Sequence, residues 1–92
     1  MKIFKYKINE PDNHGISIMH LPEHFEPLSV GAQNEDLVIW GLVLDQDDTI
    51  LSRKIVVLNT GMSLPIIGSK LKFIGTVTTN NGIVWHIFDI KN

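Results

Sequence analysis

The eight basic residues of this 92-residue chain all lie outside positions 8–52, which carry nine of the ten carboxylates. The basic residues are Lys2, Lys5, Lys7, Arg53, Lys54, Lys70, Lys72 and Lys91. If the first strand lies beside the strands that follow Arg53, these side chains form one positive patch on a protein of net charge −2. Such a patch suits a small anion, because a site for long nucleic acid needs many phosphate contacts. Alternatively, the lysines only keep strand edges soluble.

The candidates for phosphate binding are the backbone N–H groups of the turn Asn59-Thr60-Gly61 and six basic side chains, namely Lys5, Lys7, Arg53, Lys54, Lys70 and Lys72. Arg53 is the strongest candidate, because a guanidinium can bind phosphate through two parallel hydrogen bonds and can also stack on a base. We expect an Arg53→Ala variant to bind ligand less tightly and to keep its thermal stability. Gly61 would let the backbone approach an anion closely, although Thr-Gly pairs are common in ordinary turns.

Two aromatic residues are candidates to stack on a nucleotide base. Tyr6 and Trp85 lie among polar neighbours, and each combines a flat face with a hydrogen-bonding group. Trp40 lies in a continuous apolar run and is predicted to be in the core or in an interface. Asn59 could read a base edge, and His86 could donate a hydrogen bond or act as an acid or base. Core packing is the alternative role for Tyr6, Trp85 and His86.

Few residues could support catalysis or bind a metal. The chain has no cysteine, which excludes disulfides, thiolate zinc sites and cysteine nucleophiles. His20 and His24 are spaced like a zinc-binding pair, but Pro22 between them disfavours the helix that would place both on one face. The acidic run 45–48 is not followed by the glycine and glutamate of a calcium loop. We therefore expect a binding protein without catalytic residues, metal or cofactor.

Apolar residues predict strands at residues 4–8, 16–21, 28–32, 37–44, 53–58, 71–79 and 83–90. The run 37–44 is apolar on both faces, which indicates the centre of a sheet or an oligomer interface. Two hairpins are expected, one around residues 33–36 and one through Asn80-Asn81-Gly82, where Asn-Gly favours a type I′ turn. Residues 59–65 form a loop that could include a helical turn before Gly68.

These elements predict a single all-β domain over residues 1–92. Its expected form is a small antiparallel sandwich or half-open barrel of six to seven strands, with at most one short helical turn. The first seven residues carry a charge at every second or third position, which argues against a signal peptide or a membrane span there. We expect a soluble protein inside the cell.

Four short segments of the chain carry a resemblance, and they are Lys2–Tyr6, Val30–Asn34 leading into Ile39-Trp40, Asn59-Thr60-Gly61 with Pro65 beyond it, and residues 73–77 with 85–88. Together they resemble a widespread family of small phage proteins. Within that group the chain resembles the phage anti-CBASS sponge proteins, which bind a cyclic dinucleotide without cleaving it. The resemblance implies a homotetramer that holds 3′,3′-cGAMP or a related immune signal in the host cell cytoplasm. Such a ligand has two-fold or pseudo-two-fold shape, and a symmetric interface supplies the same groups twice. Met62 departs from the family, because a polar residue is expected after the Thr-Gly pair.

Three other functions are open at this point. A cyclic-nucleotide phosphodiesterase would require His86 or His20 to pair with a carboxylate at the site. An inhibitor of a host protein would use an exposed strand edge and the surface of residues 37–44 to bind its partner by strand addition. A structural phage domain would bind no ligand at all. Turnover of the nucleotide separates the first alternative from a sponge.

Overall fold

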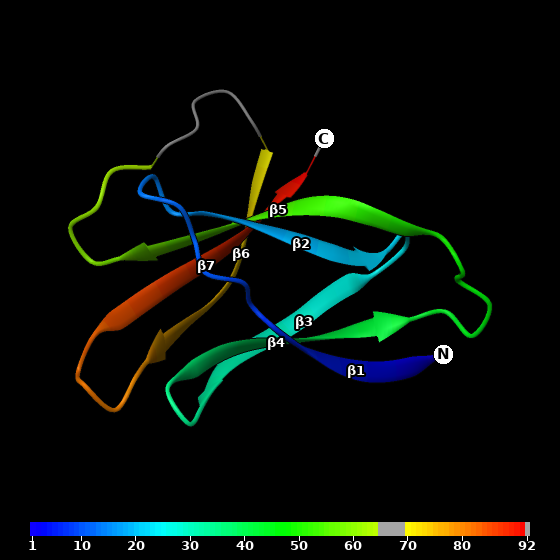
Figure 1. Cartoon of the computed structure of the whole chain (residues 1–92), viewed down its shortest axis with the longest axis horizontal. Coiled ribbons are helices and arrows are strands. Elements are labelled where there is room, and N and C mark those ends of the chain that lie inside the picture. Colours follow the sequence, from blue (N-terminus) through cyan, green and yellow to red (C-terminus); the bar gives the residue numbers. More distant parts are fainter. Residues whose placement is uncertain (65–69, 92) are drawn as a thin grey trace.

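The computed structural model describes residues 1–64 and 70–91, which form seven β-strands (Figure 1). The strands are β1 (Lys2–Lys7), β2 (Ile16–Pro22), β3 (Glu26–Gln33), β4 (Asp36–Val43), β5 (Ile50–Asn59), β6 (Lys70–Thr78) and β7 (Val84–Lys91). Every pairing between them is antiparallel. The predicted all-β fold is confirmed. The helical turn expected before Gly68 falls partly outside the described residues.

The strands form two sheets that share one core. Sheet A has the order β1-β4-β3, and sheet B has the order β2-β5-β7-β6. The strand β4 is central in sheet A, as its continuous apolar run predicted. The β1 strand pairs with β4 and not with any strand of sheet B. The first lysines and Arg53 therefore lie in different sheets, and the single positive patch that required them side by side does not form.

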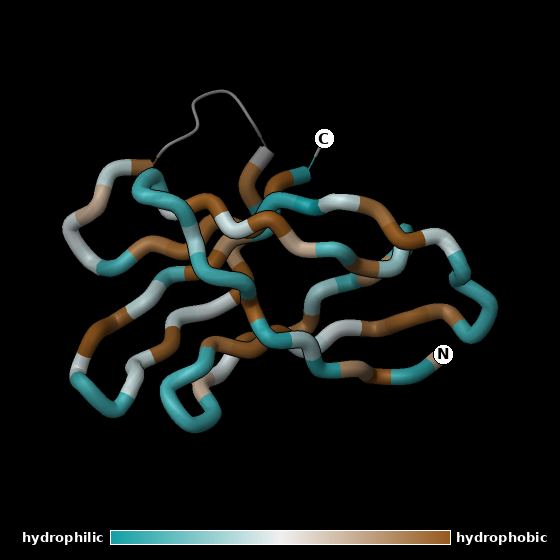
Figure 2. The backbone as a smooth tube through the Cα atoms, viewed as in Figure 1, coloured by the Kyte–Doolittle hydropathy of each residue, from teal (hydrophilic) through white to brown (hydrophobic). Residues whose placement is uncertain are grey.

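The core consists of the inward-facing residues of both sheets, together with Ile8 just after β1 and Phe25 from the turn between β2 and β3. Its buried members are Ile8, Met19, Leu21, Phe25, Ile39, Val43, Ile55, Val57, Val77 and Ile87. Figure 2 shows that hydrophobic residues follow the strands, whereas the turns are mostly hydrophilic. The Phe25 ring packs against Gly41, where a Cβ would be 2.2 Å from Phe25 Cζ. This close approach of ring to backbone explains the glycine in a central strand.

The two hairpins are confirmed, but the turn type predicted for the second one is wrong. Asn34 and Glu35 have φ angles of 52° and 71°, as the two central residues of a type I′ turn require. The β6–β7 connection spans residues 79–83, and within it the hydrogen bond from the Thr79 N–H to the Ile83 carbonyl (3.0 Å) encloses three residues. Of these three, only Gly82 has a positive φ, of 84°. The Gly82 N–H donates to the Thr79 carbonyl (2.9 Å). This geometry is a type I turn followed by a left-handed glycine, so the type I′ prediction for Asn81-Gly82 was wrong.

The segment before β2 covers part of that strand's free edge. Asn9 Nδ2 donates to the Ile18 carbonyl (2.8 Å), and the Asp12 N–H donates to the Ile16 carbonyl (2.9 Å). Asp12 Oδ1 accepts the N–H groups of Ile16 and His14, and these bonds lower the pKa of the Asp12 carboxyl. These contacts satisfy backbone groups that an edge strand would otherwise expose. Within residues 1–64 and 70–91 no helix is long and apolar enough to cross a membrane.

Candidate functional site

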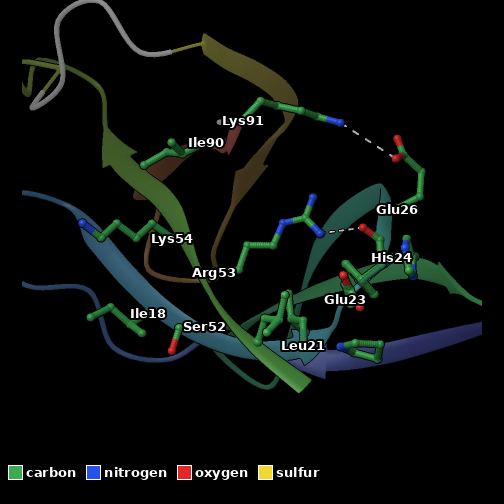
Figure 3. Close-up of a pocket in the computed structure, with 13 residues that line it drawn as sticks. Ile18, Leu21, Glu23, His24, Glu26, Ser52, Arg53, Lys54, Ile90 and Lys91 are labelled. Atoms are coloured by element: carbon green, nitrogen blue, oxygen red, sulfur yellow. Dashed lines mark hydrogen bonds and ion pairs between the residues drawn. The ribbon is translucent and has the colours of Figure 1, made fainter. Parts of the chain in front are cut away.

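A groove of about 760 Å³ lies where β5 and β7 separate. The strand β5 pairs with β2 over residues 50–56, but it pairs with β7 only over residues 55–59. Beyond the pair of Ile55 with Asp89, the two strands therefore diverge. Figure 3 shows Arg53 and Lys54 on opposite sides of β5, with Ile90 and Lys91 across the groove. Glu26 of β3 completes the lining, so both sheets contribute to it.

Arg53 is held by an ion pair at the base of this groove. Its Nε donates to Asp89 Oδ1 (3.1 Å), and its Nη2 donates to Asp89 Oδ2 (2.5 Å). Its Nη1 donates to the Phe25 carbonyl (2.6 Å). The Asp89 side chain has no exposed surface, and the Arg53 side chain is 20% exposed. A guanidinium has five N–H groups, so the three bonds leave two that could reach a ligand.

On the wall of the groove opposite Arg53, Glu26 of sheet A contacts two lysines of sheet B. Lys72 Nζ donates to Glu26 Oε1 (2.8 Å), and Lys91 Nζ lies 3.9 Å from Glu26 Oε2. The hydrogen bond from Lys72 is the main reason that the pKa of Glu26 is lowered, and Lys91 and Arg53 add to the effect. The carboxylate is thus already balanced by cations and repels an incoming anion less than a free carboxylate would.

Lys54 is the cation of the groove that keeps its charge uncompensated. It forms no ion pair with any residue in the described part of the chain. Together with the two remaining N–H groups of Arg53 and the ammonium of Lys91, it gives the groove donors for an anion. The apolar side chains Ile18, Leu51 and Ile90 line the same space and could contact a base. A charged and an apolar part of one ligand could therefore be bound together.

A family comparison covers the whole of this fold. The family described as a domain of unknown function, DUF7352, matches residues 1–92. The chain belongs to the DUF7352 family. No curated protein and no solved structure matched the sequence.

In this DUF7352 domain, the lysines of β1 that were predicted to bind phosphate do not line the groove. Lys5 and Lys7 share a face of sheet A, where Lys5 Nζ donates to Gln33 Oε1 (2.7 Å) and Lys7 Nζ lies 3.5 Å from Asp36 Oδ1. Tyr6 points to the opposite face and packs edge-on against Phe25, with ring centroids 5.5 Å apart. Tyr6 therefore takes the alternative role of core packing, as part of the boundary of the apolar cluster.

The remaining predicted residues gather at the other end of β5, on two faces of sheet B. Asn59 is opposite Trp85, and Trp85 packs against the core. On the outer face, His86 Nε2 lies 2.8 Å from Thr60 Oγ1, and His86 Nδ1 lies 3.2 Å from Thr76 Oγ1. Gly61 follows Thr60 with a φ of 100°. The structure thus brings Thr60 and His86 together, and pairs Asn59 with Trp85, but it does not unite the nine predicted residues in one site.

One group of side chains near the groove has metal-ligating atoms. The ligand atoms of Glu23, His24 and Asp47 lie within 4.8 Å of one another. Asp47 is almost buried, and its Oδ2 accepts the backbone N–H of His24 (2.8 Å). This bond ties the loop after β4 to the turn after β2, which accounts for the burial of Asp47 without an ion. His20, the other histidine of the predicted pair, lies opposite Ser52 on β5 and is not part of the group.

Sequence reasoning missed the carboxylates that shape the groove. Asp89 is the only carboxylate after Asp48, and it follows Ile87 at a two-residue interval in a strand. That spacing places Asp89 on the inward face, which was a signal for a buried partner. Glu26, Asp47 and Lys91 gave no such signal, because no local pattern marks them as inward-facing or paired.

Proposed function

We propose that this DUF7352 protein binds and sequesters a cyclic dinucleotide, such as 3′,3′-cGAMP, without cleaving it. In the host cell cytoplasm, a homotetramer of this phage protein would in this way block CBASS activation. The groove between β5 and β7 is the observation that carries the proposal. Its volume of about 760 Å³ lies within the range of small-molecule sites, roughly 300–1,000 Å³.

The chemistry of the groove supports an anionic ligand with apolar parts. Lys54, Lys91 and the two remaining N–H groups of Arg53 suit phosphate oxygens. Ile18 and Ile90 offer apolar surface for a base. Because Arg53 is balanced by Asp89, Lys54 contributes the main uncompensated charge. We therefore place the phosphate contacts of the proposed site at Lys54 and Lys91, in addition to Arg53.

A phosphodiesterase is the second candidate, and one pair of residues favours it. His24 Nδ1 lies 3.6 Å from Asp47 Oδ2, and His24 lines the groove. A histidine paired with a carboxylate can act as a general base. His86, by contrast, contacts two threonine hydroxyls, and no described carboxylate pairs with it or with His20. The rival enzyme would therefore use His24.

The two candidates are separated by what is recovered after binding. Purified protein is incubated with a panel of cyclic dinucleotides and cyclic ADP-ribose isomers, and depletion of each compound from the filtrate is measured. The protein is then denatured, and the released compound is identified. We expect depletion of a cyclic dinucleotide and its intact recovery. A linear product would establish the enzyme, and no depletion of any compound would overturn the nucleotide proposal.

Paired variants locate the binding site. The double variant Lys54→Ala/Lys91→Ala removes two charges from the groove, and Lys5→Ala/Lys7→Ala removes two from the outer face of sheet A. We expect the first to lower affinity by at least about tenfold and the second to keep wild-type affinity. Loss of binding only in the second variant would move the site to the lysines of β1.

A further inference from the structure

The outer face of sheet B carries a row of apolar side chains beside a few polar ones, and two of the apolar residues, Ile18 and Phe73, are more than half exposed. Register places Val56 beside Phe88 and Phe88 beside Phe73, and it places Ile18 beside Lys54. These residues alternate with the inward-facing core residues, so they point away from sheet A. Phe73 and Ile18 are 54% and 52% exposed. The Phe73 and Phe88 rings pack edge-on, with centroids 5.4 Å apart.

The centre of this face already resembles an interior. Val56 has no exposed surface, yet it lies outside the cluster that fills the space between the sheets. In sandwich proteins the outward residues are usually polar, whereas sheets that are apolar on both faces are usually covered on both. The strand β5 follows the second pattern, because Ile55, Val56, Val57 and Leu58 are all buried.

The outer face of sheet A is also apolar along β4, where register places Val38, Trp40 and Leu42, but it differs in charge. It carries Lys5 and Lys7, which contact Gln33 and Asp36 across the sheet. Among the described residues that register places on the outer face of sheet B, Lys54 is the only Lys, Arg, Asp or Glu. A face with one such charge offers nothing to select a highly charged partner.

We propose that a second copy of this chain packs on the outer face of sheet B, sheet against sheet. Four strands spaced about 4.8 Å apart and about eight residues long give a flat footprint of roughly 500 Å². Two copies would bury roughly 1,000 Å² in total, which reaches the lower bound for a specific interface. The same face on both copies makes the contact isologous, and it supplies one of the interfaces that a symmetric tetramer requires.

This interface adjoins the proposed nucleotide site. Ile18, Lys54 and Ile90 belong to the outer face and also line the groove. A second copy on the face therefore lies next to the groove, and the pair of grooves is related by two-fold symmetry, as a cyclic dinucleotide is. Self-association itself needs no nucleotide. It can be measured without ligand, so a failure of the interface and a failure of nucleotide binding are distinguishable.

The test is the mass of the ligand-free protein in solution, measured by sedimentation equilibrium over a range of concentrations. We expect wild type to contain two or four chains, and Phe73→Lys to weaken association at least about tenfold. Ile3→Lys is the matched control, because Ile3 is 60% exposed on the outer face of sheet A. Circular dichroism should show that both variants are folded. A monomeric wild type at high concentration would overturn the inference, as would association lost in Ile3→Lys and kept in Phe73→Lys.

A second measurement remains informative if Phe73→Lys does not fold. The chain has no cysteine, so a nitroxide label at Thr78→Cys, on the outer face of sheet B, would be the only one per chain. We expect dipolar coupling between labels of two chains, and we expect Ile18→Lys to reduce it. Absence of coupling in the ligand-free protein would overturn the inference.

Discussion

Arg53 on β5 and Asp89 on β7 form an ion pair with two hydrogen bonds, at the point where these strands separate. The Asp89 carboxylate is fully buried, and Arg53 also donates to the Phe25 carbonyl in the neighbouring turn. The Arg53 guanidinium lies 5.9 Å from the centroid of the Phe25 ring, within the range of a cation–π contact. A single side chain therefore connects both strands of the groove to the core.

Replacing Arg53 should destabilise the fold. An Arg53→Ala variant leaves the Asp89 charge buried without a partner, which typically costs about 3 to 5 kcal/mol. We expect this loss in the free energy of unfolding measured with urea. The sequence alone predicted that this variant keeps its thermal stability. The buried ion pair leads to the opposite prediction. Lys54→Ala, at the next position, is the control and should change stability by less than about 0.5 kcal/mol. Wild-type stability of Arg53→Ala would contradict the buried pair.

Local patterns were sufficient to predict the fold of this chain. Hydrophobic patterns located all seven strands, and the doubly apolar run at 37–44 identified the centre of sheet A. The turn types were harder to predict. Glu35 adopts a positive φ that few side chains favour, and the type I′ turn lies there because Gln33 and Asp36 are paired. The Asn81 side chain instead accepts hydrogen bonds from Thr79 Oγ1 and the Ile83 N–H, which favours the three-residue turn.

The candidate site could not be assembled in the same way. Which strands become neighbours depends on non-local pairing, and the pairing of β1 with β4 removed Lys5 and Lys7 from the side of Arg53. The groove itself depends on how far β5 pairs with β7, which no local pattern shows. The inward position of Asp89 was predictable, however, and it indicated a buried carboxylate that needs a cationic partner, although the sequence does not show which of the eight basic residues that is.

Gly41 should tolerate no side chain while Phe25 is present. A Cβ at Gly41 would be 2.2 Å from Phe25 Cζ and 2.7 Å from the Glu26 carbonyl oxygen. We expect Gly41→Ala to lose about 1 to 3 kcal/mol of stability, as other overpacked cores do. A double-mutant cycle with Phe25→Leu tests the cause, because the shorter side chain removes the ring contact. The alanine should cost less in that background. An equal cost in both backgrounds would assign the effect to the backbone contact alone.

The lowered pKa of Glu26 predicts a loss of stability in acid. Because the folded pKa lies below the ordinary value of 4.5, ionised Glu26 stabilises the fold fully at pH values above 4.5. This contribution is lost as the pH falls below 4.5 and through the folded pKa. It should not exceed about 1 kcal/mol, because the Glu26 side chain is 45% exposed.

A Glu26→Gln variant tests this dependence. It should be less stable than wild type at neutral pH, and the difference should shrink in acid, where wild-type Glu26 is protonated as well. Unfolding curves at both pH values give the comparison. Glu10→Gln is the control, because Glu10 forms no ion pair with a residue in the described ranges. A difference that persists unchanged in acid would contradict the ionic contribution.

Glycine should be required at position 82 because of its backbone conformation, and not because a side chain would lack space there. Its φ of 84° is left-handed, and a Cβ there would meet no heavy atom within 4 Å. We expect Gly82→Val to lose about 1 to 2 kcal/mol, because a β-branched residue is strained at positive φ. Gly82→Asn is the matched variant, and it should lose less, because asparagine tolerates this region well. Thermal unfolding of both variants provides the measurement. Equal losses would show that the cost does not arise from φ, and nucleotide binding should be unchanged in either variant because Gly82 lies outside the groove lining.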